Sequence, residues 1–229
     1  MQKIYKVGTR TSALALKQVE AILASLNKFY PAWQVEIVGI NTYGDKDRNT
    51  PISQIEGSSF FTDEIDEALS RGELDFAVHS AKDLADNLRE GLTVAAITSS
   101  IDPYDVLVAK ASLTLDRLPY GAKIGTSSLR RKTQLKKYRP DFQIIDIRGN
   151  IEERLNLLDN DKILNLDALV IAAAGLIRLG LEDRITQRIP FEILRPHPLQ
   201  GSLAVLTKTS NIDLIKLLSK LDCREASWT

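Results

Sequence analysis

The segment DFAVHSAKDL places a lysine and a carboxylate directly after an apolar stretch. Phe76 and Val78 alternate with their neighbours as in a buried strand, and Lys82 and Asp83 come just past its end. Open α/β sheets bind their ligands at the carboxyl ends of the strands. A carboxylate at such an edge can transfer protons, and a lysine beside it can bind an anion. The stretch alone is equally compatible with a surface Lys–Asp pair at a turn.

Arginines stand at several other junctions between predicted strands and helices. Arg130 and Arg131 lie in the first turn of a helix that begins near Ser128, where the helix dipole disfavours cations by up to about 1 kcal/mol. An anionic ligand would offset this cost, and a guanidinium can bind both oxygens of a carboxylate. Any single arginine is more simply a surface residue. Together they predict a polyanion site, whose arginines are Arg10, Arg130, Arg131, Arg148, Arg154 and Arg178.

Two stretches share the order strand, Gly-Thr, serine, helix, namely VGTRTSALAL and IGTSSLRRKTQL. Each would leave backbone N–H groups and a hydroxyl at a helix N-terminus, which suits an anion, although ordinary N-capping explains either stretch alone. His79 is interpreted as a hydrogen-bonded structural histidine rather than a base or a metal ligand. The sequence contains no P-loop, dinucleotide fingerprint, serine–histidine triad or Cys/His zinc pattern, so we expect no metal.

Strands and helices alternate along the chain. We predict helices over 12–28, 62–70, 128–138, 150–158 and 212–221, and strands over 4–7, 35–40, 75–78, 93–97, 105–109, 122–124, 142–147, 169–172 and 203–206. Two connections that contain proline, 99–103 and 196–202, interrupt the pattern. We therefore expect two α/β domains, the first formed by 1–99 and 202–229 and the second by 103–196, with these connections as hinges and a ligand cleft between the domains.

Composition sets broad limits. The 229 residues are 44% hydrophobic, as expected for soluble domains with a sizeable core. Thirty basic residues balance 30 acidic ones, which argues against nucleic-acid binding in bulk. The single cysteine, Cys223, excludes an intrachain disulfide. We find no signal peptide and no membrane-spanning apolar run, and we expect a cytoplasmic protein without a membrane partner.

A series of segments occurs in the order and spacing of a known enzyme family: VGTRTSALALKQ, GINTYGDKDRNTP, FFTDEID, DFAVHSAKDL, IGTSSLRRKTQL, DIRGNIEERL, AAAGLIRLGLEDRI and PLQGSLAV. Through these segments the chain resembles, over nearly its whole length, the hydroxymethylbilane synthase family, also called porphobilinogen deaminase. The resemblance implies two domains of type II periplasmic-binding-protein-like fold. It also implies the activity of a transferase of haem biosynthesis, which joins four porphobilinogens head to tail with loss of ammonia.

The same resemblance implies a dipyrromethane cofactor that primes the chain, and porphobilinogen and linear polypyrroles as ligands. Each pyrrole carries an acetate and a propionate, so the growing product is the kind of polyanion that the arginines predict. Uroporphyrinogen III synthase is implied as the next enzyme, or as a fused partner. By resemblance Asp83 is the catalytic acid–base residue.

The other site residues also follow from the resemblance. Phe61 matches an aromatic residue packed near the cofactor. The residues that match contacts to substrate or cofactor carboxylates are Arg10, Ser12, Ser80, Lys82, Thr126, Ser127, Ser128, Arg130, Arg131, Arg148, Gly149, Arg154, Arg178 and Gln200. We expect Arg130 and Arg131 to bind pyrrole carboxylates rather than a protein acid, so that leucine at either position leaves the thermal stability unchanged or higher.

Three departures from the family pattern keep alternatives open. KDLAD stands where the family has KD followed by a Val-Pro pair. The loop IEGSSFF, residues 55–61, lacks the usual lysine. The sequence stops where the family's third domain, with its cofactor-binding Gly-Gly-Cys loop, would begin, so we expect a form that lacks this domain. The chain is then a working two-domain synthase, a polycarboxylate-binding module without turnover, or one part of a longer or fused polypeptide. Cys223 is either a lone cysteine near the end of the sequence, which is the simpler interpretation, or a candidate for covalent cofactor attachment.

Overall fold

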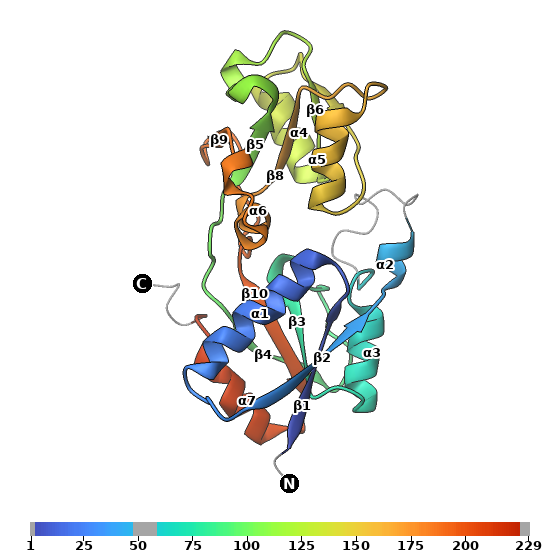
Figure 1. Ribbon diagram of the computed structural model, residues 1–229, viewed down its shortest axis with the longest axis vertical. Coiled ribbons are helices and arrows are strands. Elements are labelled where there is room, and N and C mark those ends of the chain that lie inside the picture. Colours follow the sequence, from blue (N-terminus) through green and yellow to red (C-terminus); the bar gives the residue numbers. More distant parts are fainter. Residues whose placement is uncertain (1–2, 48–58, 225–229) are drawn as a thin grey trace. The chain divides into compact units, whose positions relative to one another are not determined.

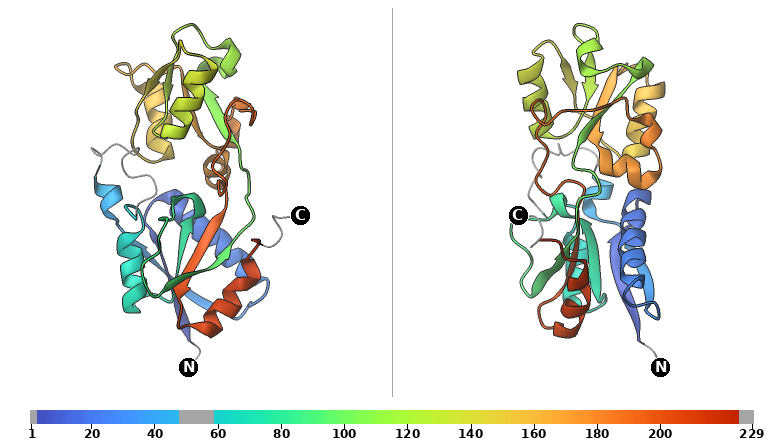
Figure 2. Two further views of the ribbon diagram at one scale, coloured as in Figure 1. Left: turned by 180° about the vertical axis from the view of Figure 1, so that it is seen from behind. Right: turned by 90° about the vertical axis from the view of Figure 1, so that its left-hand side faces the viewer.

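The computed structural model describes residues 3–47 and 59–224, which form two compact units (Figure 1). Unit 2 holds Asp102–Gln200, and unit 1 holds the described residues before Asp102 and from Gly201 onwards. Each unit contains its own five-stranded sheet with helices packed on it (Figure 2). Residues 55–58 of the IEGSSFF loop lie outside the described residues.

The sheet of unit 1 has the strand order β2-β1-β3-β10-β4. Its strands are β1 (Ile4–Arg10), β2 (Gln34–Ile40), β3 (Phe76–Ser80), β4 (Leu92–Ile97) and β10 (Leu203–Lys208). β1 is parallel to β2 and β3, whereas β10 is antiparallel to both β3 and β4. Ser80 and Ile97 pair with the successive residues Leu203 and Ala204, so the carboxyl ends of β3 and β4 lie at one edge of the sheet.

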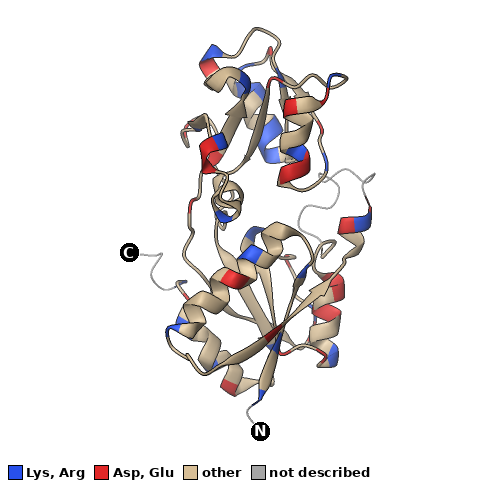
Figure 3. Ribbon diagram, in the orientation of Figure 1, with Lys and Arg blue, Asp and Glu red and all other residues tan. Residues whose placement is uncertain are grey.

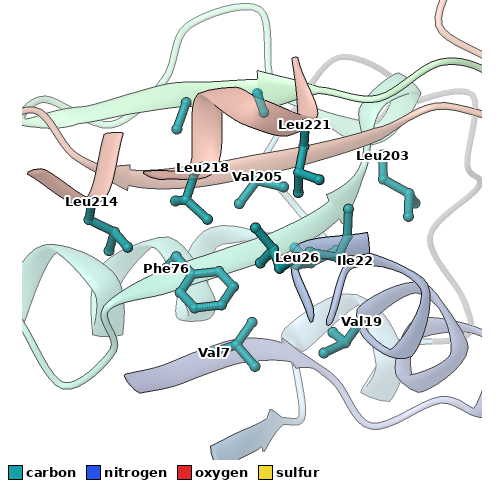
Figure 4. Close-up of a cluster of buried hydrophobic side chains, with 13 residues drawn as sticks. Val7, Val19, Ile22, Leu26, Phe76, Leu203, Val205, Leu214, Leu218 and Leu221 are labelled. Carbon is teal, nitrogen blue, oxygen red and sulfur yellow. The ribbon is translucent and has the colours of Figure 1, made fainter. Parts of the chain in front are cut away.

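The helices of unit 1 bury their apolar sides against this sheet. They are α1 (Ala13–Asn27), α2 (Tyr43–Lys46), α3 (Asp63–Arg71) and α7 (Ile212–Leu218), with 3-10 turns at η2 (Ala81–Asp83) and η6 (Ser219–Leu221). Ile22 and Leu26 of α1 and Leu218 of α7 meet the fully buried Phe76 of β3 in one core (Figure 4). Burying each such side chain contributes about 1.5–3 kcal/mol, which fixes the strand that leads to Asp83.

The sheet of unit 2 has the order β7-β6-β8-β5-β9. Its strands are β5 (Asp105–Ala109), β6 (Lys123–Gly125), β7 (Gln143–Ile145), β8 (Ala168–Ala172) and β9 (Gln187–Arg188). β6 is parallel to β7 and β8, and β5 is antiparallel to β8 and β9. Leu107 belongs to one core cluster and its neighbours Val106 and Val108 to another. Because alternate residues of a strand face opposite sides, both faces of this sheet are buried.

Three helices cover the sheet of unit 2: α4 (Leu129–Tyr138), α5 (Ile151–Asn160) and α6 (Ala173–Leu179). Short 3-10 turns are found at η3 (Lys110–Ser112), η4 (Leu115–Arg117) and η5 (Glu182–Arg184). α4 carries a concentration of Lys and Arg residues (Figure 3). Leu135 of this helix is fully buried, and it anchors α4 to the core of unit 2. Arg130 and Arg131 lie in the first turn of the helix that is anchored in this way.

The predicted α/β class is confirmed for both units, and every predicted strand and helix is present with bounds shifted by a few residues. The strand predicted over 142–147 ends at Ile145, so Arg148 lies in the loop before α5 rather than at a strand end. α2 and β9 are too short for the sequence pattern to predict. Across the described residues, no helix combines the length and the apolar character needed to cross a membrane.

Candidate functional site

The turn that carries Asp83 is built directly on the central strand of unit 1. β3 is buried until Ser80, whose extended backbone starts the 3-10 turn η2. The backbone N–H of Ala81 donates to the carbonyl of Ser202 (3.0 Å), which ties the turn to β10. Lys82 and Asp83 are half-buried, and the Asp83 side chain makes no hydrogen bond or ion pair within the described residues. The fold thus presents a fixed carboxylate at the edge of the sheet.

A buried pair supports the same strand. Nε2 of His79 lies 3.1 Å from Oδ1 of Asp66 in α3, and both side chains are at most 7% exposed. The prediction that His79 is hydrogen-bonded is therefore confirmed, whereas its partner Asp66 was missed. Among the described residues, no group of three His, Cys, Asp or Glu side chains could hold a metal ion.

Arg10 ends β1 and pairs with Asp45 of α2, to which its Nε donates at 3.1 Å. Its guanidinium also lies over the Phe61 ring, 4.7 Å from the centroid. Burial by itself would raise the pKa of Asp45, but Arg10 outweighs it and holds this pKa below its ordinary value. Ser12 caps α1 by accepting a hydrogen bond from the N–H of Ala15 (3.3 Å). The structure thus brings two of the predicted site residues of unit 1, Arg10 and Phe61, into contact.

In unit 2, Arg130 and Arg131 both contact the carboxylate of Asp105, the first residue of β5. Nη2 of Arg131 lies 2.7 Å from Oδ1, and Nη2 of Arg130 lies 2.8 Å from Oδ2. Asp105 is fully buried. Burial by itself would raise its pKa, but Arg131 and Arg130 outweigh burial and lower the pKa below its ordinary value. The expectation that neither arginine pairs with a protein acid is therefore wrong.

Gln200 joins this network rather than standing apart from it. Its Nε2 donates to Oδ1 of Asp105 (3.0 Å) and to the carbonyl of Pro103 (2.7 Å), and the residue is 1% exposed. Arg131 also donates to the carbonyl of Val170 (3.2 Å). Because β5 and β8 pair side by side, they present Asp105 and this carbonyl to the same guanidinium.

Two further arginines lie near Arg131. Nε of Arg154 donates to the carbonyl of Gly149 (2.8 Å). Burial, and then the positive charges of Arg131 and Arg148, lower the pKa of Arg154 to about 10. Arg154 therefore stays charged at neutral pH in a neighbourhood that disfavours its charge. Such a group of cations favours an anion with several charges.

Gly149 is required by its backbone at this point. Its φ is 101°, a left-handed conformation that favours glycine, and a Cβ there would lie 2.5 Å from Oε2 of Glu153. Glu153 is needed where it is, because it forms a capping box with Asn150 at the start of α5. Gly149 thus lets the loop carrying Arg148 turn tightly into the helix carrying Arg154.

Hydroxyl groups accompany the arginines at the N-terminus of α4. The Oγ1 atom of Thr126 is buried and has no hydrogen-bond partner within the described residues, which is costly unless a ligand supplies one. Ser127 donates to the carbonyl of Ile147, and Ser128 is the N-cap residue of α4. Arg178 is half-buried near the end of α6, and burial lowers its pKa below the ordinary value.

The sequence analysis missed three acids that pair with side chains of these strands and helices: Asp45 with Arg10, Asp66 with His79, and Asp105 with Arg130 and Arg131. Asp105 alone had a usable signal, because an aspartate that opens the apolar run VLVA has to be buried with a partner. Cys223 is half-buried, and its backbone N–H donates to the carbonyl of Ile97 (2.8 Å) at the end of β4. It therefore lies at the same sheet edge of unit 1 as the Asp83 turn.

The fold defines the class of protein first. The chain is similar to the probable amino-acid ABC transporter extracellular-binding protein ytmK from Bacillus subtilis, with a TM-score of 0.56 and 14% identity over 96% of this chain and 91% of that one. It is also similar to the methionine binding protein MetQ, with a TM-score of 0.55 and 16% identity over 95% and 89% of the two chains. At these identities the likeness concerns the fold, and it confirms a fold of the periplasmic-binding-protein type.

Sequence relatives then identify the family. The profile described as "Porphobilinogen deaminase, dipyromethane cofactor binding domain" matches residues 5–216. Porphobilinogen deaminase of Natranaerobius thermophilus is 46% identical over 96% of this chain and 70% of that protein. The Geobacter sulfurreducens porphobilinogen deaminase is 46% identical over 87% and 62% of the two chains. The chain belongs to the porphobilinogen deaminase family, and the match lies in the domain that binds the dipyrromethane cofactor.

The two arginines of α4 should differ in their effect on stability. Replacing Arg131 with leucine leaves the buried Asp105 without its main partner, which costs about 3–5 kcal/mol of unfolding free energy. Replacing Arg130 with leucine should cost no more than about 1 kcal/mol, because Asp105 keeps Arg131 and a cation leaves the first turn of the helix. Urea unfolding followed by circular dichroism measures both. Equal losses in the two variants would contradict this division of roles.

Proposed function

We propose that this chain acts as a hydroxymethylbilane synthase, joining four porphobilinogens head to tail with loss of ammonia. The observation that carries the proposal is the arginine group of unit 2. Arg130 and Arg131 share one fully buried acid, Asp105, and the charges of Arg131 and Arg148 act on Arg154. This surplus of positive charge suits a ligand with several carboxylates, and a chain of pyrroles bearing acetate and propionate groups is such a ligand.

The residues present also fit the dipyrromethane cofactor of the family. Its carboxylates would be held mainly by Arg130, Arg148 and Arg154, with Arg131 supporting them from within the protein, and the buried Thr126 Oγ1 would gain the hydrogen-bond partner that it lacks within the described residues. Arg178 and Lys82 would bind further carboxylates, with Ser12, Ser80, Ser127 and Ser128 as polar contacts. When bound, the cofactor supplies the primer pyrrole on which the product is built.

Asp83 is assigned the acid–base role. The reaction requires a group that protonates the departing amine and removes the proton lost after each coupling. It also creates a cationic species from the substrate as ammonia leaves, which a nearby carboxylate stabilises. Asp83 suits these tasks because its turn is anchored to β10 while its carboxylate is not engaged by other described side chains. Phe61, stacked under Arg10, would pack near the rings.

The location and the next step belong to the same proposal. We place the enzyme in the cytoplasm, with uroporphyrinogen III synthase as the enzyme that takes its linear product. A coupled assay tests the transfer, since added uroporphyrinogen III synthase should convert the product to the cyclic tetrapyrrole.

Replacing Asp83 with asparagine should lower porphobilinogen consumption about a hundredfold or more, because the substitution keeps the shape and removes the proton-transferring group. The matched control is Asp86→Asn, which removes an exposed carboxylate from the same loop and should leave the rate near that of the wild type. Circular dichroism should show that both variants are folded. If Asp83→Asn keeps more than about a tenth of the activity, the assignment of Asp83 is wrong.

Cys223 is proposed as the point of covalent cofactor attachment. It lies at the carboxyl end of β4, two strands from the end of β3, which corresponds to about 10 Å between the strand ends. A thiol at this distance could hold a primer whose pyrroles extend towards Asp83. Intact-mass measurement of the purified protein should then show an adduct of two pyrrole units that is absent from Cys223→Ser. An adduct retained in Cys223→Ser, or turnover by a wild-type protein without an adduct, would exclude attachment at this residue.

A further inference from the structure

The proposed function relies on the arginines and assigns no role to the buried carboxylate of Asp105 that pairs with two of them. We propose that Asp105 is the resident counter-anion of the arginine group, which a ligand carboxylate displaces from Arg130 when it binds. The inference rests on the proposed function for the identity of the ligand as a polycarboxylate. It makes Asp105 a residue that sets affinity and exchange without itself touching the substrate.

The two arginines are held by Asp105 in different ways. Arg131 directs both Nε (2.9 Å) and Nη2 (2.7 Å) at Oδ1, and its side chain is 7% exposed. Its remaining contacts, to Val170 and Gln200, are also within the protein. A guanidinium has five N–H donors, so few of those on Arg131 remain for a ligand. Arg131 is therefore a structural cation.

Arg130 is held more loosely. Its Nη2 lies 2.8 Å from Oδ2 of Asp105, but this oxygen accepts no hydrogen bond of regular geometry within the described residues. The Arg130 side chain is 25% exposed, and Nη1 donates to the backbone carbonyl of Arg195. An ion pair without a directed hydrogen bond is the weaker of the two contacts of Asp105. Arg130 is thus the cation that can turn to an incoming carboxylate.

The network lets this exchange occur without leaving Asp105 unpaired. When Arg130 turns away, Oδ1 still accepts hydrogen bonds from Arg131 and from Gln200 Nε2 (3.0 Å). Gln200 is itself fixed by its bond to the Pro103 carbonyl. A buried carboxylate left without partners would oppose ligand binding strongly, and this arrangement avoids that cost.

The resident anion also has a consequence for turnover. Without Asp105, Arg130 and Arg131 would add two uncompensated charges to those of Arg148 and Arg154, and Arg131 already disfavours the charge of Arg154. Such a group would bind polycarboxylates more tightly and release them more slowly. A growing product gains two carboxylates with each added pyrrole, so its carboxylates must be able to leave one arginine and bind another as the chain lengthens. Asp105 therefore keeps the binding reversible.

Asp105→Asn tests the inference, because it keeps the side-chain size and removes the charge. Benzenehexacarboxylate serves as the probe at matched ionic strength, and thermal unfolding and calorimetry as the readouts. Without the probe, Asp105→Asn should melt at a lower temperature than the wild type. The probe should then raise its melting temperature more than that of the wild type, with a Kd about three- to tenfold lower. With porphobilinogen, both KM and kcat should fall.

The matched control is Asp141→Asn, which breaks another Asp–Arg pair of unit 2, Asp141 with Arg139 at 2.7 Å. It should lower the melting temperature without strengthening the response to the probe. A merely structural Asp105 would behave like this control, and that outcome would overturn the inference. Unchanged or weaker probe binding in Asp105→Asn would overturn it as well.

A second variant covers the case in which Asp105→Asn does not fold. Arg130→Leu, in the otherwise wild-type protein, should abolish most of the melting-temperature rise caused by the probe. A rise equal to that of the wild type would overturn the inference, because Arg130 would then not be the exchanging cation. None of these readouts needs turnover. A wild-type protein that binds the probe as described but does not consume porphobilinogen would therefore refute the proposed function alone.

Discussion

The pairing of two guanidinium groups, those of Arg130 and Arg131, with the one buried carboxylate of Asp105 is the interaction on which the rest of the site depends. Asp105 is fully buried, and it keeps its charge because Arg130 and Arg131 outweigh the effect of burial on its pKa. The arginines in turn tolerate their positions in the first turn of α4 because this anion lies against them. The two arginines on one carboxylate leave an excess of positive charge, which would favour a polycarboxylate.

The surrounding strands and helices position these charged side chains next to one another. The paired strands β5 and β8 present Asp105 and the Val170 carbonyl to one arginine, and the buried Leu135 holds α4 against the sheet. The left-handed Gly149 allows a tight turn into α5, so that Arg154 approaches Arg131. Both faces of the sheet are packed, which leaves the strand ends and helix N-termini as the places for polar chemistry.

In unit 1, by contrast, the fold holds the Asp83 carboxylate in place without pairing it with an arginine among the described residues. The buried β3 and the His79–Asp66 pair make the support rigid, and the bond from Ala81 to Ser202 ties down the turn. Asp83 is left at the sheet edge without an arginine partner among the described residues, whereas the nearby Arg10 has Asp45. Arg10 thus has its own acid within unit 1.

The sequence by itself determined the α/β class, the order of the elements and the candidate residues for binding and catalysis. These follow from apolar periodicity and from local motifs such as GTSSLRR and HSAKD. Tertiary structure decided which charges meet. Asp105 stands 26 residues before Arg131, and Asp66 faces His79 from another element, so no local spacing links them. The antiparallel insertion of β10 places the ends of β3 and β4 at one edge. A buried charge requires a partner. Which residue becomes that partner is decided by the strand order, and the strand order depends on contacts between distant parts of the chain.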